Sequence, residues 1–234
     1  MTDRTTIAVA VCTYNRNEPL QVLLDALLVA AADVADLADV GVVVVDDRAD
    51  GAARPVVDAY EGKFALGVHY RVSGRQNISL ARNLAIETAM GVGEWIAMTD
   101  DDCEPVPGWL REYVEVQRRT GADAVTGPMR LRVPVGSPAW LEDQPFFADQ
   151  LLPFTDGQRT DTAATNNSFL RASFVRGHPE IRFRPELGVL GGEPVELRHQ
   201  GLGERGAGAG QHRRARHVVD EQRREVLRPT QRAG

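Results

Sequence analysis

The sequence has 234 residues, 43% of them hydrophobic and 26% charged, and its formal net charge is −6. This composition is ordinary for a soluble globular protein, and the length fits one large domain, or one domain with an appendage, that can bury a proper core. The negative charge argues against general nucleic-acid binding, and the longest apolar run, Ala26–Ala32, is too short to cross a membrane. The N-terminus lacks a basic region followed by an apolar one, so we expect a cytoplasmic protein.

The first part of the chain alternates strand patterns with helical ones. Ile7–Cys12 and Gly41–Val45 are continuous apolar runs, which are typical of strands buried on both faces of a parallel sheet. Between them, five leucines recur at helical spacing over residues 20–28. A short helix near 53–60 and a strand at 68–72 continue the alternation. The pattern predicts an α/β sheet with right-handed crossovers.

A further helix and strand lead to a cluster of carboxylates. Residues 77–90 carry apolar side chains on one helical face, and the strand-like run Trp95–Met98 is soon followed by three aspartates, Asp100 to Asp102. In open α/β sheets, ligands bind outside the carboxyl ends of the strands. We therefore expect the polar loops after three strands to share one crevice; they are residues 13–17, 46–47 and 100–102.

The aspartate triplet is a candidate cation site. Three adjacent carboxylates raise one another's pKa unless a positive group lies among them. Oxygen ligands suit Mg²⁺ or Mn²⁺, which use one or two protein carboxylates and leave the other positions to water and phosphates. A solvated acidic loop is the alternative that the triplet alone leaves open. Cys12 and Cys103 have neither metal-site nor disulfide spacing, and neither is a candidate nucleophile.

The next segment loses this regular alternation. After a helix near 107–119 and a strand near 122–127, residues 140–154 are rich in proline and aromatic side chains. Such a segment would form a lid, an acceptor wall, or a contact with a partner or with a membrane surface as a peripheral protein. Packing onto the core is the simpler alternative. A short strand is expected near 165–170.

The end of the chain is a different kind of sequence. From Arg198 onward there are nine arginines against four acidic residues, with no aromatic side chain. Such a segment buries too little apolar surface to offset its ordering entropy, apart from a short helix near 218–227. We expect a domain at 1–196 and a largely disordered Arg/Gly-rich tail at 197–234.

Five motifs resemble those of family-two glycosyltransferases and occur in the same order. They are Val9–Arg16, Val43–Asp47, Ser79–Asn83, Trp95–Asp102 and Gly191–Glu193. The resemblance covers about residues 5–196, and residues 46–57 are most similar to the bacterial succinoglycan-biosynthesis branch. It implies a GT-A fold, with a Rossmann-like, mostly parallel sheet flanked by helices. It also implies an inverting, metal-assisted transfer of a sugar from a nucleotide-diphosphate donor, with uridine the expected base, to a glycan, lipid-linked or small-molecule acceptor.

The resemblance implies roles for single residues in the nucleotide site. Thr13, Tyr14, Arg16 and Asp47 would hold the nucleoside, with Asp47 accepting a hydrogen bond from the base. The side chains agree with this, since Tyr14 offers a ring that can stack and Asp47 an acceptor at a strand end. The residues alone leave open that Tyr14 is an ordinary turn residue and Asp47 a helix cap.

The same resemblance places the diphosphate and the metal. Arg82 would approach the diphosphate, because a guanidinium fork matches phosphate oxygens, although a solvated helix position is its ordinary alternative. Asp100 and Asp102 match the D-x-D element. Asp100 would contact ribose or sugar hydroxyls, and Asp102 would bind the Mn²⁺ or Mg²⁺ that bridges the phosphates, with Asp100 as its neighbour in the metal site. Asp101, between them, is assigned to the nucleotide site.

The expected catalytic base departs from the family pattern. The family has Gly-Gly-Glu-Asp, whereas this chain has Gly191-Gly192-Glu193-Pro194-Val195-Glu196, so a proline stands at the position of the aspartate. Glu193 and Glu196 are the candidates to take the proton of the acceptor hydroxyl. Family-like sequence ends at this point, and an altered reading frame or a truncation would explain the tail.

Two other functions stay open. One is a nucleotide-sugar or glycan binder that has lost its base, which Pro194 favours. The other is a magnesium-dependent nucleotidyltransferase, which also uses a carboxylate pair at a strand end. Those enzymes usually have a glycine-rich, basic loop after the first strand, and residues 12–17 contain no glycine.

Overall fold

The computed structural model describes residues 4–129, 132–133, 136–142, 144, 157–160, 163–188 and 216–217. Within them, strands and helices alternate through residue 126 as the sequence predicts, and the fold is a mixed α/β one. The strands are β1 (Thr5–Thr13), β2 (Ala38–Asp46), β3 (Val68–Val72), β4 (Trp95–Asp100), β5 (Ala124–Thr126), β6 (Ser168–Arg171) and β7 (Arg216–His217). The helices are α1 (Asn17–Asp33), α2 (Arg54–Asp58), α3 (Ile78–Ala89), α4 (Trp109–Thr120), α5 (Ala139–Glu142) and α7 (Ala172–Gly177).

The strands form one sheet in the order β3-β2-β1-β4-β6-β5-β7. The first four strands of this order run parallel, whereas β6 is antiparallel to both of its neighbours. The parallel register places Thr13 beside Asp46 and Cys12 beside Asp100. The loops after β1, β2 and β4 therefore leave the sheet at the same edge, as expected from the sequence.

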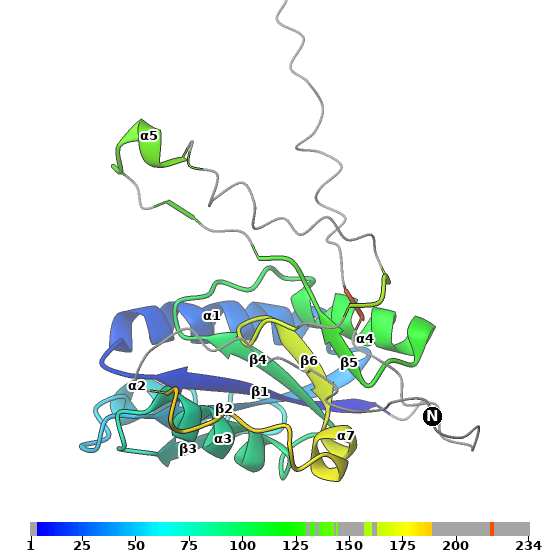
Figure 1. The fold of residues 1–234 in the computed structure, drawn as a ribbon, viewed down its shortest axis with the longest axis horizontal. Coiled ribbons are helices and arrows are strands. Elements are labelled where there is room, and N and C mark those ends of the chain that lie inside the picture. Colours follow the sequence, from blue (N-terminus) through cyan, green and yellow to red (C-terminus); the bar gives the residue numbers. More distant parts are fainter. Residues whose placement is uncertain are drawn as a thin grey trace, which may run out of the picture.

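Helices cover both faces of the sheet, with α1 and α4 on one face and α3 and α7 on the other (Figure 1). Alternate strand residues point to opposite faces. Val9 and Val11 pack toward the leucines of α1, whereas Ala8 and Ala10 pack toward the alanines of α3. Because both faces are buried, the strands read as continuous apolar runs rather than as an alternation.

The structure extends and corrects the predicted elements in two places. Strand β4 does not end at Met98 but continues to Asp100, so the first aspartate of the triplet is part of the sheet. Helix α7 was not predicted, because six residues are too few to show a helical period.

Several predicted features lie wholly or partly outside the described residues. Within the aromatic segment, α5 stands away from the sheet in Figure 1, and its Trp140 is 62% exposed. In the tail, β7 pairs in parallel with β5, and the rest of 197–234 is not described. Both candidate bases, Glu193 and Glu196, are among the residues not described. No helix in the described part of the chain is both long and apolar enough to span a bilayer.

Candidate active site

Asp101 joins the ends of two neighbouring strands. Its Oδ2 accepts a hydrogen bond of 2.8 Å from the Thr13 hydroxyl, and its Oδ1 accepts one of 3.1 Å from Arg16 Nη1. Burial raises the pKa of the Asp101 carboxyl, and the bonds from Thr13 and Arg16 oppose that shift. The Asp101 carboxylate thus links the loops after β1 and β4, and little of it is exposed for contact with a ligand.

Asp102 is the exposed member of the triplet. Its side chain is 56% exposed, and Oδ2 accepts from Arg16 Nη1 at 2.7 Å. The same nitrogen therefore bridges Asp101 and Asp102. The charge of Asp101, and to a lesser extent that of Asp102, raises the pKa of the Arg16 guanidinium. Asp102 is consequently the carboxylate of this group that is most accessible to an incoming cation.

Asp100 pairs with an arginine from a different element. Arg82 on α3 reaches across to Asp100 Oδ1 at 3.2 Å, and its guanidinium carbon lies 5.4 Å from the centre of the Phe183 ring. The Arg82 side chain is only 12% exposed, so the solvated helix position considered above is wrong. Arg82 thus pairs with the first aspartate of the triplet, and Arg16 with the other two.

Asp47 organises the loop that leads into α3. Its Oδ1 accepts from the Ser73 hydroxyl and from the Arg75 backbone N–H, and its Oδ2 accepts from the Asn77 N–H at 2.6 Å. The residue is buried. A contact between Asp47 and a nucleotide base stays a prediction, because each carboxylate oxygen already has a protein donor and a base would have to share one. Tyr14, by contrast, is 46% exposed and presents its ring to solvent.

The sequence did not distinguish the roles of the adjacent residues Asp46 and Asp47. Asp46, adjacent to Asp47, accepts from the backbone N–H groups of Arg48 and Ala53 and from the Tyr70 hydroxyl at 2.7 Å. It fixes the loop between β2 and α2, and burial raises the pKa of Tyr70. The dipeptide Asp46-Asp47 signals a polar strand end, but only the fold shows that each aspartate holds a different loop.

Two asparagines of the α3 region hold a distant segment, which the sequence did not reveal. Asn83 makes a reciprocal pair with the Phe183 backbone, donating to its oxygen at 2.8 Å and accepting from its nitrogen at 2.9 Å. Asn77 caps α3 by accepting from Leu80 N–H and also donates to the Pro185 oxygen.

The close approach continues to Gly188. Its carbonyl accepts from the Ile78 N–H at 3.2 Å, and a Cβ at this position would overlap Asn77 Oδ1. Segment 181–188 thus lies along the start of α3, directly before the residues that include Glu193 and Glu196.

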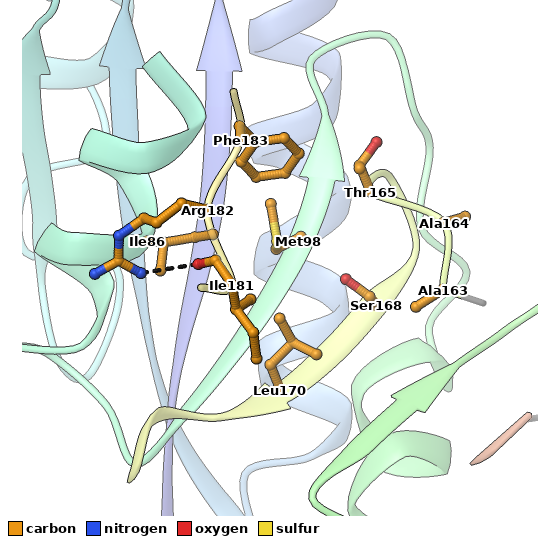
Figure 2. Close-up of a pocket in the computed structure, with 10 residues that line it drawn as sticks. All are labelled: Ile86, Met98, Ala163, Ala164, Thr165, Ser168, Leu170, Ile181, Arg182 and Phe183. Carbon is orange, nitrogen blue, oxygen red and sulfur yellow. Dashed lines mark hydrogen bonds between the residues drawn. The ribbon is translucent and has the colours of Figure 1, made fainter. Parts of the chain in front are cut away.

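A small pocket lies under this segment on the α3 side of the sheet. Figure 2 shows Phe183, Met98, Ile181 and Leu170 around it, with Ala163 to Thr165 along the other side. The Arg182 side chain points away from the pocket, where its Nη1 donates to the Ile181 oxygen. The lining is mainly apolar, so this pocket offers no acid–base or metal chemistry.

The two cysteines are also unsuited to nucleophilic chemistry. Burial is the main cause that raises the pKa of both Cys12 and Cys103. Their thiols therefore stay protonated at neutral pH, and a thiol is a poorer nucleophile than a thiolate.

The carboxylates fit a metal that is bound jointly with a substrate. Among the described residues there is no group of three or more His, Cys, Asp or Glu side chains able to hold a metal ion. Asp100 and Asp102 nevertheless provide oxygen ligands at a partly exposed edge, 32% and 56% exposed, and each gives one oxygen to an arginine. Mg²⁺ and Mn²⁺ commonly take one or two protein carboxylates and complete their shell with phosphates and water.

The position of these groups is the usual ligand site of open α/β sheets, at the carboxyl ends of the parallel strands. Residues 8–177 match the family described as glycosyl transferase family 2. This match covers more than half of the sequence, and the chain belongs to that family.

Particular relatives agree with this assignment. The chain is 34% identical over 194 residues to the succinoglycan biosynthesis protein ExoM of Rhizobium meliloti (strain 1021), covering 82% of this chain and 59% of ExoM. It thus spans less than two thirds of that relative's length.

Solved structures share the fold at low identity. TarS 1-349 of S. aureus superposes with a TM-score of 0.59 at 20% identity, covering 78% of this chain and 51% of that one. The mannosyltransferase PcManGT of Pyrobaculum calidifontis gives a TM-score of 0.50 at 19% identity, covering 75% and 47%. The expected GT-A-type fold is confirmed.

Proposed function

We propose that this chain is a glycosyltransferase domain that moves a sugar from a nucleotide-diphosphate donor, with a divalent metal, to an acceptor hydroxyl with inversion. The observation that carries the proposal is the cluster at the ends of β1 and β4. There, Arg16 and Arg82 flank three aspartates that include the exposed Asp102. Guanidinium groups suit phosphate oxygens, and the carboxylates suit the metal that accompanies them.

The remaining groups at this edge support a nucleoside next to the diphosphate. Tyr14 is exposed in the loop after β1 and offers an aromatic face to a base. Thr13 and Asp101 keep that loop fixed against the end of β4. In this arrangement Asp101 positions the site rather than contacting the nucleotide. Asp47 shapes the neighbouring wall, and one of its oxygens accepts a hydrogen bond from the base in addition to the one from the protein.

The chemistry proposed at this site is a displacement at the anomeric carbon. The acceptor oxygen forms a bond to that carbon as the bond to the nucleoside diphosphate breaks, and negative charge grows on the departing phosphates. Arg16, from the loop after β1, and Arg82, from α3, stabilise that charge. Asp102, with Asp100 beside it, would hold the divalent metal, which would add positive charge at the diphosphate.

The proton of the acceptor hydroxyl goes to a carboxylate on the segment after Gly188. Our candidates remain Glu193 and Glu196. Support comes from the anchoring of residues 181–188 along α3, next to Arg82 and its partner Asp100. If Glu193→Gln and Glu196→Gln both leave turnover unchanged, neither side chain is the base.

Uridine diphosphate is the proposed carrier of the sugar. TarS has been solved with UDP and with UDP-GlcNAc, and PcManGT with GDP-Man and Mn²⁺. ExoM is named for succinoglycan biosynthesis, which supports a glycan or lipid-linked glycan as acceptor.

Calorimetric titration with UDP, with and without Mn²⁺, tests the donor site. We expect binding that needs the metal and is lost in Asp102→Ala. Asp58→Ala is the matched control, because Asp58 is 57% exposed but pairs with Arg54 on α2. Absence of binding to UDP, GDP and dTDP in the wild type would overturn the proposal. Donor hydrolysis without acceptor, compared with binding without turnover, then separates an enzyme from a binding protein.

A further inference from the structure

The guanidinium of Arg16 lies against one of the two carboxylate oxygens with which Asp102 would bind a cation. Arg16 lies between β1 and α1, and its Nη1 donates to Asp101 Oδ1 at 3.1 Å and to Asp102 Oδ2 at 2.7 Å. Its side chain is 52% exposed, so it can move away from Asp102 without breaking buried packing. A metal that binds this side of Asp102 has to displace a positive group.

The two carboxylates that share Arg16 differ in how firmly they are held. Asp101 is buried and also accepts from Thr13, so it stays in place if the guanidinium leaves. Asp102 is exposed, and Arg16 is the partner that the structure gives its side chain within the described residues. Metal and arginine therefore compete for Asp102 rather than for the whole triplet.

The local charge decides which competitor wins. Two guanidinium groups, Arg16 and Arg82, already offset most of the charge of the three aspartates. A divalent cation arriving alone is repelled by Arg16 and takes the shorter of its two ion pairs, so that Asp101 is the only carboxylate of the triplet still paired with Arg16. A cation arriving with a diphosphate brings a new anion for Arg16, and the N-terminus of α1, at Asn17, also favours negative charge there.

We propose that Arg16 makes metal binding depend on the nucleotide: it holds Asp102 against free Mn²⁺ and transfers to the donor diphosphate when metal and donor bind together. This inference rests on the proposed donor site. Arg16 is a positioning residue for the metal and a binding residue for the diphosphate. Binding of Mn²⁺ and binding of UDP are consequently coupled through one side chain, and the coupling is reciprocal.

Titration of Mn²⁺ alone into the full chain tests this directly. In Arg16→Gln we expect free Mn²⁺ to bind about tenfold more tightly than in the wild type, and UDP at saturating Mn²⁺ to bind about tenfold more weakly. The association of Mn²⁺ with UDP in solution is the same for every variant, so it cancels in the comparison. Arg16→Lys keeps the positive charge and should keep most of the exclusion of free Mn²⁺.

Two controls locate the effect. Arg48→Gln removes a neighbouring arginine that pairs with Asp50 and Asn15 instead of the triplet, and it should leave Mn²⁺ binding unchanged. The double variant Arg16→Gln/Asp102→Asn should lose the gain in Mn²⁺ affinity. Circular dichroism of each variant verifies that it is folded.

The outcomes separate the inference from the proposed function. If the wild type binds UDP with Mn²⁺ but Arg16→Gln gains no affinity for free Mn²⁺, the competition is wrong and the donor site stands. If no protein binds UDP under any condition, the donor site itself fails.

Discussion

Two buried tyrosines donate hydrogen bonds to aspartates around α2. Tyr70 donates to Asp46 at 2.7 Å, and Tyr60 donates to Asp25 at 2.7 Å and lies close to the Gln21 carbonyl on α1. Burial is the largest cause that raises the pKa of both phenols, and for Tyr60 the value is about 12. These contacts tie β3 to the end of β2, and the segment after α2 to α1.

The Tyr60 bond predicts a pH effect on stability. An unfolded tyrosine loses its proton near pH 10, whereas Tyr60 in the folded chain does so near 12. Between these values the unfolded state binds fewer protons, so this contribution to stability is complete below about pH 10 and is lost as the pH rises toward 12.

We expect Tyr60→Phe to cost about 1 kcal/mol at pH 7 and to weaken the fall in stability above pH 10. Urea denaturation of both proteins at pH 7 and across the alkaline range measures this. Parallel pH profiles would contradict the assignment.

At the scale of elements, α3 serves as the support for segment 181–188. Asn83 bonds to both the N–H and the C=O of Phe183, and Asn77 donates to the Pro185 oxygen while capping the helix. The Asp47 carboxylate in turn holds the Asn77 N–H at 2.6 Å. Asp47, just after β2, is therefore linked through Asn77 to the segment that precedes the candidate bases.

The two asparagines predict different losses. Asn77→Ala removes a helix cap and should lower the free energy of unfolding by about 1 kcal/mol, whereas Asn83→Ala removes only the hold on Phe183. Both variants should show faster proteolytic cleavage near 181–188 and lower turnover, with nearly unchanged affinity for UDP. Thr88→Ala, which loses a bond to the Leu84 oxygen within α3 itself, is the control. Cleavage as slow as in the wild type would show that these contacts do not hold the segment.

For the whole molecule, an aromatic column joins the parallel and antiparallel parts of the sheet. Phe169 on β6 stacks on Trp95 of β4 with ring centres 4.6 Å apart, and on Tyr113 of α4 at 5.1 Å. Asn167 accepts from both Trp109 Nε1 and the Tyr113 hydroxyl. This packing fixes β6 beside β4 and keeps the candidate site at one end of a rigid sheet.

Ligand binding at that edge should stabilise the entire domain. At a UDP concentration 100 times its Kd, with Mn²⁺ present, linkage gives about 2.7 kcal/mol, which corresponds to a rise in Tm of about 5–10 °C for a domain of this size. Differential scanning fluorimetry measures the rise, and EDTA should reverse it. A rise that survives EDTA would show that the metal is dispensable for nucleotide binding.

The location of the candidate site was predictable from the sequence, but the separate roles of its neighbouring aspartates were not. The apolar runs before Asp46 and Asp100 identified both as strand ends, which is why Thr13, Arg16 and the triplet were expected together. No local pattern distinguishes the buried Asp101 from the exposed Asp102, because adjacent residues of one type differ only in their surroundings. The bonds from Asn77 and Asn83 to segment 181–188 were missed because they join residues about 100 positions apart in the sequence.

By itself, the sequence determined the class of fold and the motifs that define the family. Hydrophobic periodicity reports local conformation and burial, so it predicted the strands and most of the helices. Only the tertiary structure decided which side chains meet, such as Arg16 with Asp101 at a separation of 85 residues and Asn77 with Pro185 at 108. Those contacts depend on strand order and on the antiparallel insertion of β6, which bring distant residues to one edge and leave no periodic trace in the chain.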